Sequence, residues 1–409
     1  MIIIFRNARV WDGHSSDTID GACVVVENDR IQEVGSRYTA QGNTQSIDCG
    51  GRVLMPGLID AHFHACSPSV DIFGSGHLPS SLMANHAAKA LAGALKRGFT
   101  SVRDAGGGDI GLALAIEQGL IMGPRFFFAG KMLSQTGGHG DFRQSDRLES
   151  CSCSSYSGSI SLVVDGPDAV RLAAREQLRK GANQIKICIT GGLSAAGPIS
   201  MNQFSSEEVR AAVEEAATRD AYVMAHCHTD EGARRSVELG IRTIEHGSYI
   251  NQDTTAELIR ERGAYVVPTL SVANVFTNHG VELGLDAQAL SKLKGLEESM
   301  HRSIEVCSRA GVKLGLGTDL FGHQFHSRQG GEFELRGRSS KNIDVLRSAT
   351  SINAEILKKS SELGCIRPGA YADLLVMEGD PLKDLSLFKS PEANMPVVMK
   401  GGSFVRNSL

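Results

Sequence analysis

Short apolar runs alternate with amphipathic segments from residue 53 to residue 319, and this alternation constrains the fold more than any other feature. The segments between the runs, such as 80–98 and 205–220, are rich in Ala, Glu, Leu and Arg at helical spacing. The second opens with Ser-Ser and then Glu-Glu, which predicts a capping box at a helix start. Eight runs have the composition of buried parallel strands: 54–64, 100–106, 125–130, 184–190, 222–228, 242–247, 264–269 and 313–319.

The number of runs and the placement of polar residues favour a barrel over a doubly wound sheet. Eight is the strand number of a (β/α)8 barrel. Polar or ionisable residues fall at the C-terminal ends of at least six runs, where a barrel gathers its active site. A doubly wound sheet would concentrate function at one switch point, and no GxGxxG fingerprint follows a strand. We therefore expect an α/β fold built on a (β/α)8 TIM barrel.

Both ends of the chain have a different, β-rich pattern. Residues 1–50 hold short β-branched runs that are closed by Gly, Asn or Asp, and a similar pattern returns after residue 364. The two ends are therefore expected to share one small β-sandwich, formed by residues 1–56 and 365–409. Residues 57–364 then form the barrel.

Composition excludes several classes of protein. The chain has 42 Lys+Arg against 46 Asp+Glu, so the net charge of −4 argues against a nucleic-acid-binding protein. No apolar run is long enough to span a membrane, and the N-terminus reads as a strand instead of a signal peptide. Nine scattered cysteines fit a reducing compartment. These features predict a cytoplasmic protein that binds neither nucleic acid nor membranes.

The strongest local signal of chemistry is the pair His62 and His64 at the end of the first run. Residues two apart on a strand point the same way, so the two imidazoles converge in a geometry that suits a divalent metal. Two histidines that merely hydrogen-bond at the barrel mouth would give the same pattern. The pair alone does not decide between these readings.

The surrounding sequence, from Pro56 to His64, resembles the first-strand signature of the metal-dependent amidohydrolase superfamily. The resemblance extends over nearly the whole chain. It implies that Lys186 becomes N6-carboxylated and bridges two metals, and that Asp319 is the superfamily aspartate of strand eight. His226 and His246 then complete the implied metal ligands, which are His62, His64, Lys186, His226, His246 and Asp319.

Within the superfamily the sequence is most similar to the imidazolonepropionase-like group, which contains Xaa-Pro dipeptidases and ochratoxin-type amidases. Three segments carry this likeness: 137–141 (GGHGD), Lys186 with 191–194 (GGLS), and 244–247 (IEHG). The mononuclear branches of the superfamily lack the strand-four lysine. Lys186 therefore implies two divalent metals, and neutral imidazole ligands suit Zn²⁺, although Mn²⁺ and Co²⁺ fit such ligands too.

Two of these residues, Lys186 and Asp319, could also have a role other than metal binding. A bare ammonium at Lys186 would be costly to bury among Ile and Cys, which favours the carboxylated form, but the side chain could instead extend to the barrel mouth. Asp319 could cap a turn, bind metal or act as the general base. The superfamily pattern combines the last two roles, with Asp319 taking a proton from water and passing it to the leaving amine.

The substrate-facing residues are less constrained by spacing. His228 shares a strand face with His226 and could hydrogen-bond the substrate. His139, in a glycine-rich loop after the third run, could polarise the scissile carbonyl or hold a carboxylate. The long loops 137–166 and 320–337 should overhang the mouth. A cation there would recognise a substrate carboxylate, and the candidates are Arg143, Arg328 and His323.

Together these features predict a binuclear metal hydrolase that cleaves a small-molecule amide: a dipeptide or an N-acyl amino acid with a free carboxylate. The relatives are often homo-oligomers, which implies the same here. Three alternatives share the fold: a hydrolase of cyclic amides or lactones, a deaminase with one metal, and a non-catalytic binding barrel. The fold alone does not decide the substrate.

Overall fold

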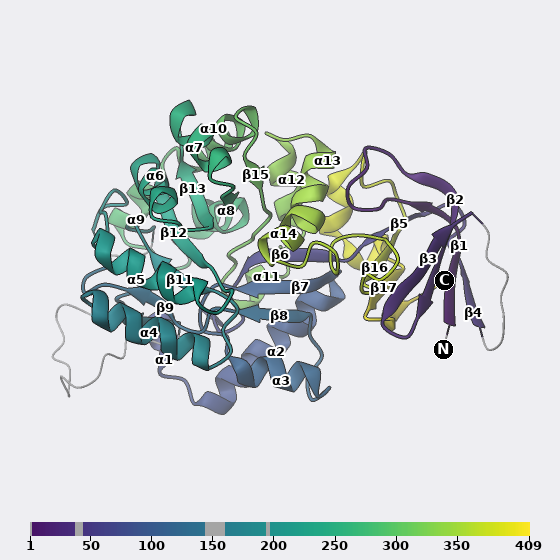
Figure 1. Ribbon diagram of the computed structural model, residues 1–409, viewed down its shortest axis with the longest axis horizontal. Coiled ribbons are helices and arrows are strands. Elements are labelled where there is room, and N and C mark those ends of the chain that lie inside the picture. Colours follow the sequence, from purple (N-terminus) through teal and green to yellow (C-terminus); the bar gives the residue numbers. More distant parts are fainter. Residues whose placement is uncertain (1, 37–43, 144–159, 194–196) are drawn as a thin grey trace.

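The chain folds into a (β/α)8 barrel with a small β-sandwich at one side, as the sequence predicts (Figure 1). The computed structural model describes residues 2–36, 44–143, 160–193 and 197–409. Most of the expected mouth loop 137–166 therefore lies outside the described residues.

The parallel strands of the barrel follow the eight predicted runs. The third run, 125–130, forms β8, which pairs with β7, and a further strand just after the run, β9, pairs with β11. An additional strand, β10 (Ser161–Val163), pairs with β9 outside the predicted set. The barrel strands are β6 (Leu58–Phe63), β7 (Phe99–Asp104), β8 (Arg125–Phe128), β9 (Met132–Ser134), β11 (Ile185–Cys188), β12 (Val223–Thr229), β13 (Thr243–Tyr249), β14 (Tyr265–Val267) and β15 (Lys313–Leu314).

The eighth run is less regular than predicted, since its ladder strand β15 covers only two residues. The chain beyond β15 still closes the barrel, because Ala61 N–H donates to Leu316 O at 2.9 Å and Asp319 N–H donates to His62 O at 2.8 Å. Gly317 permits this approach: a Cβ there would lie 2.6 Å from the Cβ of His62. The glycine thus brings the end of the eighth run directly against the two histidines of the first.

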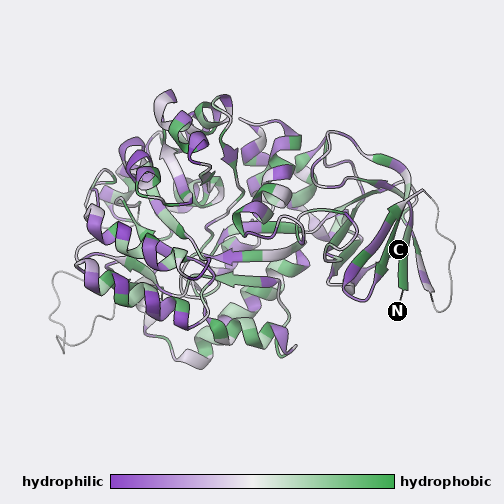
Figure 2. Ribbon diagram, viewed as in Figure 1, coloured by the Kyte–Doolittle hydropathy of each residue, from purple (hydrophilic) through white to green (hydrophobic). Residues whose placement is uncertain are grey.

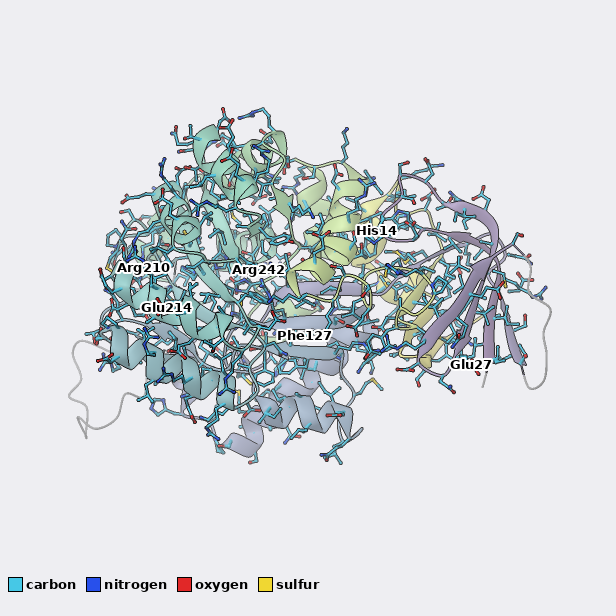
Figure 3. All side chains as sticks on the ribbon, in the orientation of Figure 1. His14, Glu27, Phe127, Arg210, Glu214 and Arg242 are labelled. Carbon is cyan, nitrogen blue, oxygen red and sulfur yellow. The ribbon has the colours of Figure 1, made fainter. Side chains whose placement is uncertain are left out.

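The helices form the outer layer, with a hydrophobic side toward the barrel and a hydrophilic side toward solvent (Figure 2). On α5, for example, Arg210 and Glu214 are exposed (Figure 3), and the predicted capping box is present between Ser205 and Glu208. The helices are α1 (Ile72–Gly76), α2 (Ser80–Lys96), α3 (Ile110–Glu117), α4 (Pro167–Arg179), α5 (Ser206–Ala217), α6 (Asp230–Glu238), α7 (Asp253–Glu261), α8 (Leu270–His279), α9 (Ala287–Lys292), α10 (Leu296–Arg309), α11 (His323–His326), α12 (Gly331–Gly337), α13 (Asn342–Arg347), α14 (Asn353–Ile356) and α15 (Pro391–Asn394).

Strands from both chain ends join in one sheet of the sandwich, in the order β18-β17-β16-β5-β1-β2-β3, with β4 paired to β1. Side chains from both ends, such as Phe5, Val24 and Met399, share one buried core. The exact domain boundaries given above stay a prediction. The sandwich strands are β1 (Ile2–Val10), β2 (Ile19–Glu27), β3 (Arg30–Gly35), β4 (Thr44–Asp48), β5 (Val53–Pro56), β16 (Leu374–Met377), β17 (Val397–Lys400) and β18 (Ser403–Asn407).

Among the helices of the described residues, none combines the length and the apolar character needed to cross a bilayer.

Candidate active site

A cavity at the C-terminal ends of the barrel strands collects most of the residues singled out from the sequence. Because parallel barrel strands end at the same face, side chains far apart in the chain meet there. The ionisable residues that line the cavity are His62, His64, His139, Lys186, His226, His228, His246 and Asp319.

The two histidines of the first run each have one ring nitrogen fixed and the other turned inward. His62 Nδ1 lies 2.7 Å from the Glu245 carboxylate, and His64 Nδ1 lies 3.1 Å from the carbonyl of Gly106. Those oxygens only accept hydrogen bonds, so Nδ1 is the donor in both rings and Nε2 carries the lone pair. Both Nε2 atoms point toward Asp319, at 3.4 Å from His62 and 3.2 Å from His64.

His226 and His246 approach from the next strands in the same manner. His226 Nε2 lies 3.2 Å from the carbonyl of Gly191, which leaves the lone pair on Nδ1. That Nδ1 is 2.9 Å from His246 Nε2, while His246 Nδ1 contacts the Thr269 hydroxyl at 2.8 Å. Burial lowers the pKa of both imidazoles well below 6.5, with a further decrease from the neighbouring histidines, so both rings are neutral.

Lys186 is buried within this cluster, with 2% of its surface exposed. Its Nζ lies 3.4 Å from His62 Nε2. Burial lowers the pKa of Lys186 below its ordinary value of 10.5, in opposition to the nearby carboxylates of Glu245 and Asp319. The side chain therefore points into the cavity instead of extending to solvent.

The donor set fits a divalent metal. Three buried residues, His62, His246 and Asp319, each offer one ligand atom, and these three atoms lie within 4.8 Å of one another. Asp319 Oδ1 is buried without a hydrogen-bond partner in the described part of the chain, and it faces the lone pairs of His62 and His64. Acceptors that face acceptors in a buried site are costly unless a cation lies among them, and imidazole and carboxylate are ligands that Zn²⁺ prefers.

Two of these residues have an unusual backbone. His246 has φ of 70° and Asp319 has φ of 53°, both in the left-handed region that residues with a Cβ rarely adopt. Such a conformation costs about 1–3 kcal/mol, and it clusters at functional sites, where the surrounding fold holds it in place. The strain thus marks the two strand ends from which these side chains enter the cavity.

A buried ion pair behind the cluster was missed by the sequence analysis. Arg103 is fully buried and donates to Glu245 at 2.8 and 3.0 Å, and Glu245 in turn accepts from His62. The Arg103 guanidinium also donates to the carbonyl of Ala61 and the hydroxyl of Thr243. Glu245 stands directly before His246, and this adjacency was the available signal.

Asp60 is a second supporting residue without an assigned role in the sequence analysis. It is fully buried and accepts hydrogen bonds from the Thr318 hydroxyl at 2.6 Å, from Gln329 at 2.8 Å and from His62 N–H at 3.1 Å. Burial raises the pKa of Asp60 to about 6. These bonds tie the histidine strand to the turn that carries Asp319. The position of Asp60, two residues before His62 on the same strand face, was the available signal.

His139 and His228 line the cavity beside the cluster. The His139 ring stacks on His226 with centroids 3.8 Å apart, and the His228 ring stacks on His246 at 4.9 Å. His228 Nδ1 contacts the Ser248 hydroxyl at 2.8 Å, whereas the buried Nδ1 of His139 has no hydrogen-bond partner among the residues described. Burial lowers the pKa of each ring to about 3, so both are neutral at ordinary pH.

The three predicted carboxylate-binding residues are not among those that line the cavity. Arg143 forms a two-pronged ion pair with Asp141, at 2.7 and 2.6 Å. Arg328 lies over the ring of Phe325 and borders a separate depression. His323 stacks on His86 at 4.6 Å. Their assignment to the substrate stays a prediction that this arrangement does not favour.

Apart from Ser248 and Thr269, the remaining wall of the cavity is apolar, and it was not foreseen from the sequence. Its members come from strand β9, from helices α8 and α10, and from loops. They are Met132, Phe142, Ile160, Leu193, Val272, Ala273, Phe276, Leu296, Met300 and Phe321.

Known proteins with the same sequence features and fold support this description. A model of the amidohydrolase family matches residues 53–405. Ochratoxinase from Aspergillus niger is 33% identical over 378 residues, which cover 87% of this chain and 76% of that protein. A solved prolidase in complex with N-methylphosphonate-L-proline is 42% identical with a TM-score of 0.95, and a Xaa-Pro dipeptidase with methionine bound in its active site is 27% identical with a TM-score of 0.87. Each alignment covers 100% of both chains.

The resemblance seen in the sequence motifs is thereby confirmed at the level of the family and of its prolidase and ochratoxinase members. The chain belongs to the amidohydrolase family and is a hydrolase that acts on amide bonds.

Proposed function

We propose that the protein is a binuclear metal-dependent amidohydrolase that cleaves dipeptides or N-acyl amino acids with a free C-terminal carboxylate. One observation carries this proposal: the ring lone pairs of the four histidines and the Asp319 carboxylate converge. Those of His62 and His64 point toward Asp319. That of His226 points toward His246. Relatives named as prolidase, Xaa-Pro dipeptidase and ochratoxinase support the substrate class.

Two metals would be held by six residues. Lys186 would bridge them as a carbamate, which forms when its neutral amine adds to CO₂ and releases one proton. Burial lowers the pKa of Lys186 and so enlarges the fraction of the neutral amine that reacts. The six residues are His62, His64, Lys186, His226, His246 and Asp319, and Zn²⁺ is the metal we expect.

When bound, the metals supply Lewis-acid polarisation of the carbonyl and make water acidic enough to ionise near neutral pH. Asp319 accepts the proton from the attacking water at a carboxylate oxygen, and it then donates that proton to the leaving amine nitrogen. Its Oδ1 is suited to this role because it is buried and accepts no hydrogen bond from any residue that the structure describes. The left-handed backbone at Asp319 directs the side chain into the cavity.

His139 and His228 would act on the substrate itself. A neutral imidazole can donate one N–H to an oxygen that gains negative charge, and both rings are neutral because burial lowers their pKa to about 3. We assign His139 to the scissile carbonyl, since it stacks directly on His226. His228, fixed by Ser248, would hydrogen-bond the substrate beside it.

The test is a screen of dipeptides and N-acyl amino acids with wild type and Asp319→Asn. Wild type should hydrolyse members of this panel, and the variant should lose turnover while it keeps its metal. Retained turnover in Asp319→Asn would contradict the role of Asp319. Activity confined to cyclic amides or lactones, or deamination with one metal per chain, would replace the proposed substrate class by one of the alternatives.

Three expectations from the sequence accompany this proposal and stay predictions: a cytoplasmic location, a homo-oligomeric state, and the division into a sandwich of 1–56 and 365–409 and a barrel of 57–364.

A further inference from the structure

Helix α8 forms part of the cavity wall, and it begins at a residue that contacts a histidine of the cluster. Val272, Ala273 and Phe276 on this helix line the cavity. The hydroxyl of Thr269, directly before the helix, lies 2.8 Å from His246 Nδ1. The start of α8 therefore affects two parts of the site at once, the orientation of His246 and the position of the apolar wall.

This helix start has no cap from its own N-cap residue. The first amides of a helix have no acceptor inside the helix, and an oxygen of the N-cap side chain usually accepts from one of them. In α8 the side chain of Thr269 makes no such bond, and the first turn contains no acidic residue. The Thr269 hydroxyl contacts His246 instead. Another part of the chain must then supply the acceptors.

Glu332 supplies these acceptors from α12, which lies beside α8 (Figure 1). Its two carboxylate oxygens accept from the N–H groups of Leu270 at 3.1 Å and of Ser271 at 2.6 Å. A negative charge is also favourable at the positive end of a helix dipole. Glu332 is fully buried, and a buried carboxylate is costly unless hydrogen bonds compensate for the loss of water. Its two bonds thus fix the residues that directly follow Thr269.

The next turn of α12 connects this arrangement to the eighth run. Arg336 is buried four residues after Glu332, and its guanidinium donates to the carbonyl of Gly315 at 2.8 Å. Burial raises the pKa of Glu332 to about 7, and the charge of Arg336 opposes this increase. Gly315 lies in the segment that leads to Asp319. Helix α12 therefore connects the start of α8 with the strand end that carries Asp319.

We propose that Glu332 is a positioning residue of the active site: by capping α8 it holds Thr269 against His246 and the apolar face of the helix toward the substrate. A Thr269 oxygen that accepts from His246 Nδ1 leaves the lone pair of that ring on Nε2, where it faces the cluster. This inference rests on the proposed function, because it concerns the same metal centre and cavity. Glu332 itself does not line the cavity.

The first test is Glu332→Gln, which keeps the size of the side chain but has one acceptor oxygen in place of two. One amide of α8 then faces an NH2 donor, so the start of the helix should shift and loosen the contact of Thr269. Affinity for Zn²⁺, measured by competition with a chromogenic chelator, should fall about 10-fold, as for other residues that orient a metal-bound histidine. KM for the best substrate of the screen should rise, because the displaced helix loses contact with the bound substrate.

Thr269→Val tests the link to the metal centre separately. It keeps the shape of the side chain and removes the oxygen that contacts His246, so it should lower Zn²⁺ affinity to a similar extent. The double variant of Thr269→Val with Glu332→Gln should lose no more Zn²⁺ affinity than Thr269→Val alone, since residues that act through one contact are not additive. Additive losses would overturn the inference. Unchanged Zn²⁺ affinity in Thr269→Val would also overturn it, whether or not Glu332→Gln folds.

Asp373→Asn is the matched control. Asp373 is a buried carboxylate that does not line the cavity, and it accepts from the Arg125 guanidinium and from Gly401 N–H. This variant should lower the free energy of unfolding in urea and leave Zn²⁺ affinity and KM unchanged. If Glu332→Gln behaves in the same way, Glu332 is merely structural, and the inference fails while the proposed function stands. If wild type binds no divalent metal, the proposed function fails, and the inference fails with it.

Discussion

The cavity has two halves that are built in different ways. The half that contains the proposed metal ligands, here called the metal half, consists of six residues that enter from the ends of barrel strands or shortly after them: His62, His64, Lys186, His226, His246 and Asp319. The apolar half, led by Val272, Phe276 and Met300, comes from α8 and α10. The first half is fixed by hydrogen bonds to carboxylates and carbonyls, whereas the second is fixed by packing in the hydrophobic core of the barrel.

This difference separates chemistry from substrate choice. Side chains fixed by hydrogen bonds hold charge and lone pairs in place, which the reaction requires. Apolar helix faces contribute contact area and shape, which affect the ground state and the transition state alike. Changes in the metal half should therefore lower metal content and kcat, and changes in the apolar half should mainly raise KM.

The largest effect is expected for Lys186→Ala. Without a bridging carbamate, metal content should fall from about two to one or fewer per chain. Turnover should fall about a thousandfold or more, because metals provide several kcal/mol of charge stabilisation. Elemental analysis and steady-state kinetics provide the measurements, and Lys180→Ala, at an exposed lysine, is the control. Two metals in Lys186→Ala would show that the lysine is structural.

Glu245→Gln should have the next largest effect. It replaces one of the two acceptor oxygens of Glu245 by an NH2 donor, so the His62 N–H loses its charged acceptor, and it leaves the fully buried Arg103 without its counter-charge. Loss of one partner of a buried pair costs about 3–5 kcal/mol, and loss of such a support weakens metal binding about 10- to 100-fold. Urea unfolding and metal titration measure the two effects.

The double variant Arg103→Met with Glu245→Gln separates stability from metal binding. Removal of both charges should restore much of the free energy of unfolding, while the weakened metal binding stays. If the double variant also regains wild-type metal affinity, the Glu245 contact does not position His62.

In the apolar half, Phe276→Ala should raise KM about tenfold for substrates with a large apolar side chain and leave metal content unchanged. Phe276 is buried and lines the cavity, and truncation removes apolar contact worth about 1–2 kcal/mol. Asn278→Ala, at an exposed position on the same helix, is the control. A fall in kcat with unchanged KM would mean that the two halves are not separable in this way.

The same difference explains what the sequence could predict. Strand alternation places His62 and His64, or His226 and His228, on one face, and the barrel brings strand ends together, so the metal half was accessible from spacing and motif. Helix residues such as Phe276 point to the cavity only because of how α8 packs on the barrel, which spacing does not encode. Loop side chains have no periodicity from which their direction could be predicted. Arg143, a candidate for the substrate carboxylate, pairs with Asp141 two residues away.

The supporting residues fall between these cases. Asp60 and Glu245 stand inside motifs that were recognised, but their roles depend on partners remote in sequence, Gln329 and Arg103. Neither Gln329 nor Arg103 stands in a sequence pattern that indicates its role, because the sequence of a strand does not reveal whether an arginine in it is buried or exposed. The sequence thus predicts the residues that meet at the strand ends better than the contacts that orient them.

The smallest effect on turnover is expected for His326, a buried histidine outside the cavity. It packs on Phe63 with ring centroids 5.0 Å apart, and neither ring nitrogen has a hydrogen-bond partner among the described residues. Unlike His62, His64, His226 and His246, this imidazole therefore has no nitrogen fixed by a hydrogen bond. Burial, followed by the charges of Arg97, His323 and His64, lowers its pKa from 6.5 to about 3.

Acid should therefore destabilise the fold through His326. Between pH 6.5 and about 3 the unfolded chain binds a proton at this residue and the native chain does not, so stability is complete above pH 6.5 and is lost as pH falls. One such group contributes up to about 1.4 kcal/mol per pH unit. In His326→Leu this contribution to stability should be absent. The free energy of unfolding, measured with urea on the metal-free proteins between pH 7 and 4.5, should therefore change less steeply with pH for the variant than for wild type. Parallel slopes would mean that His326 is protonated in the native state, and its burial would then need a counter-charge that the described residues do not provide.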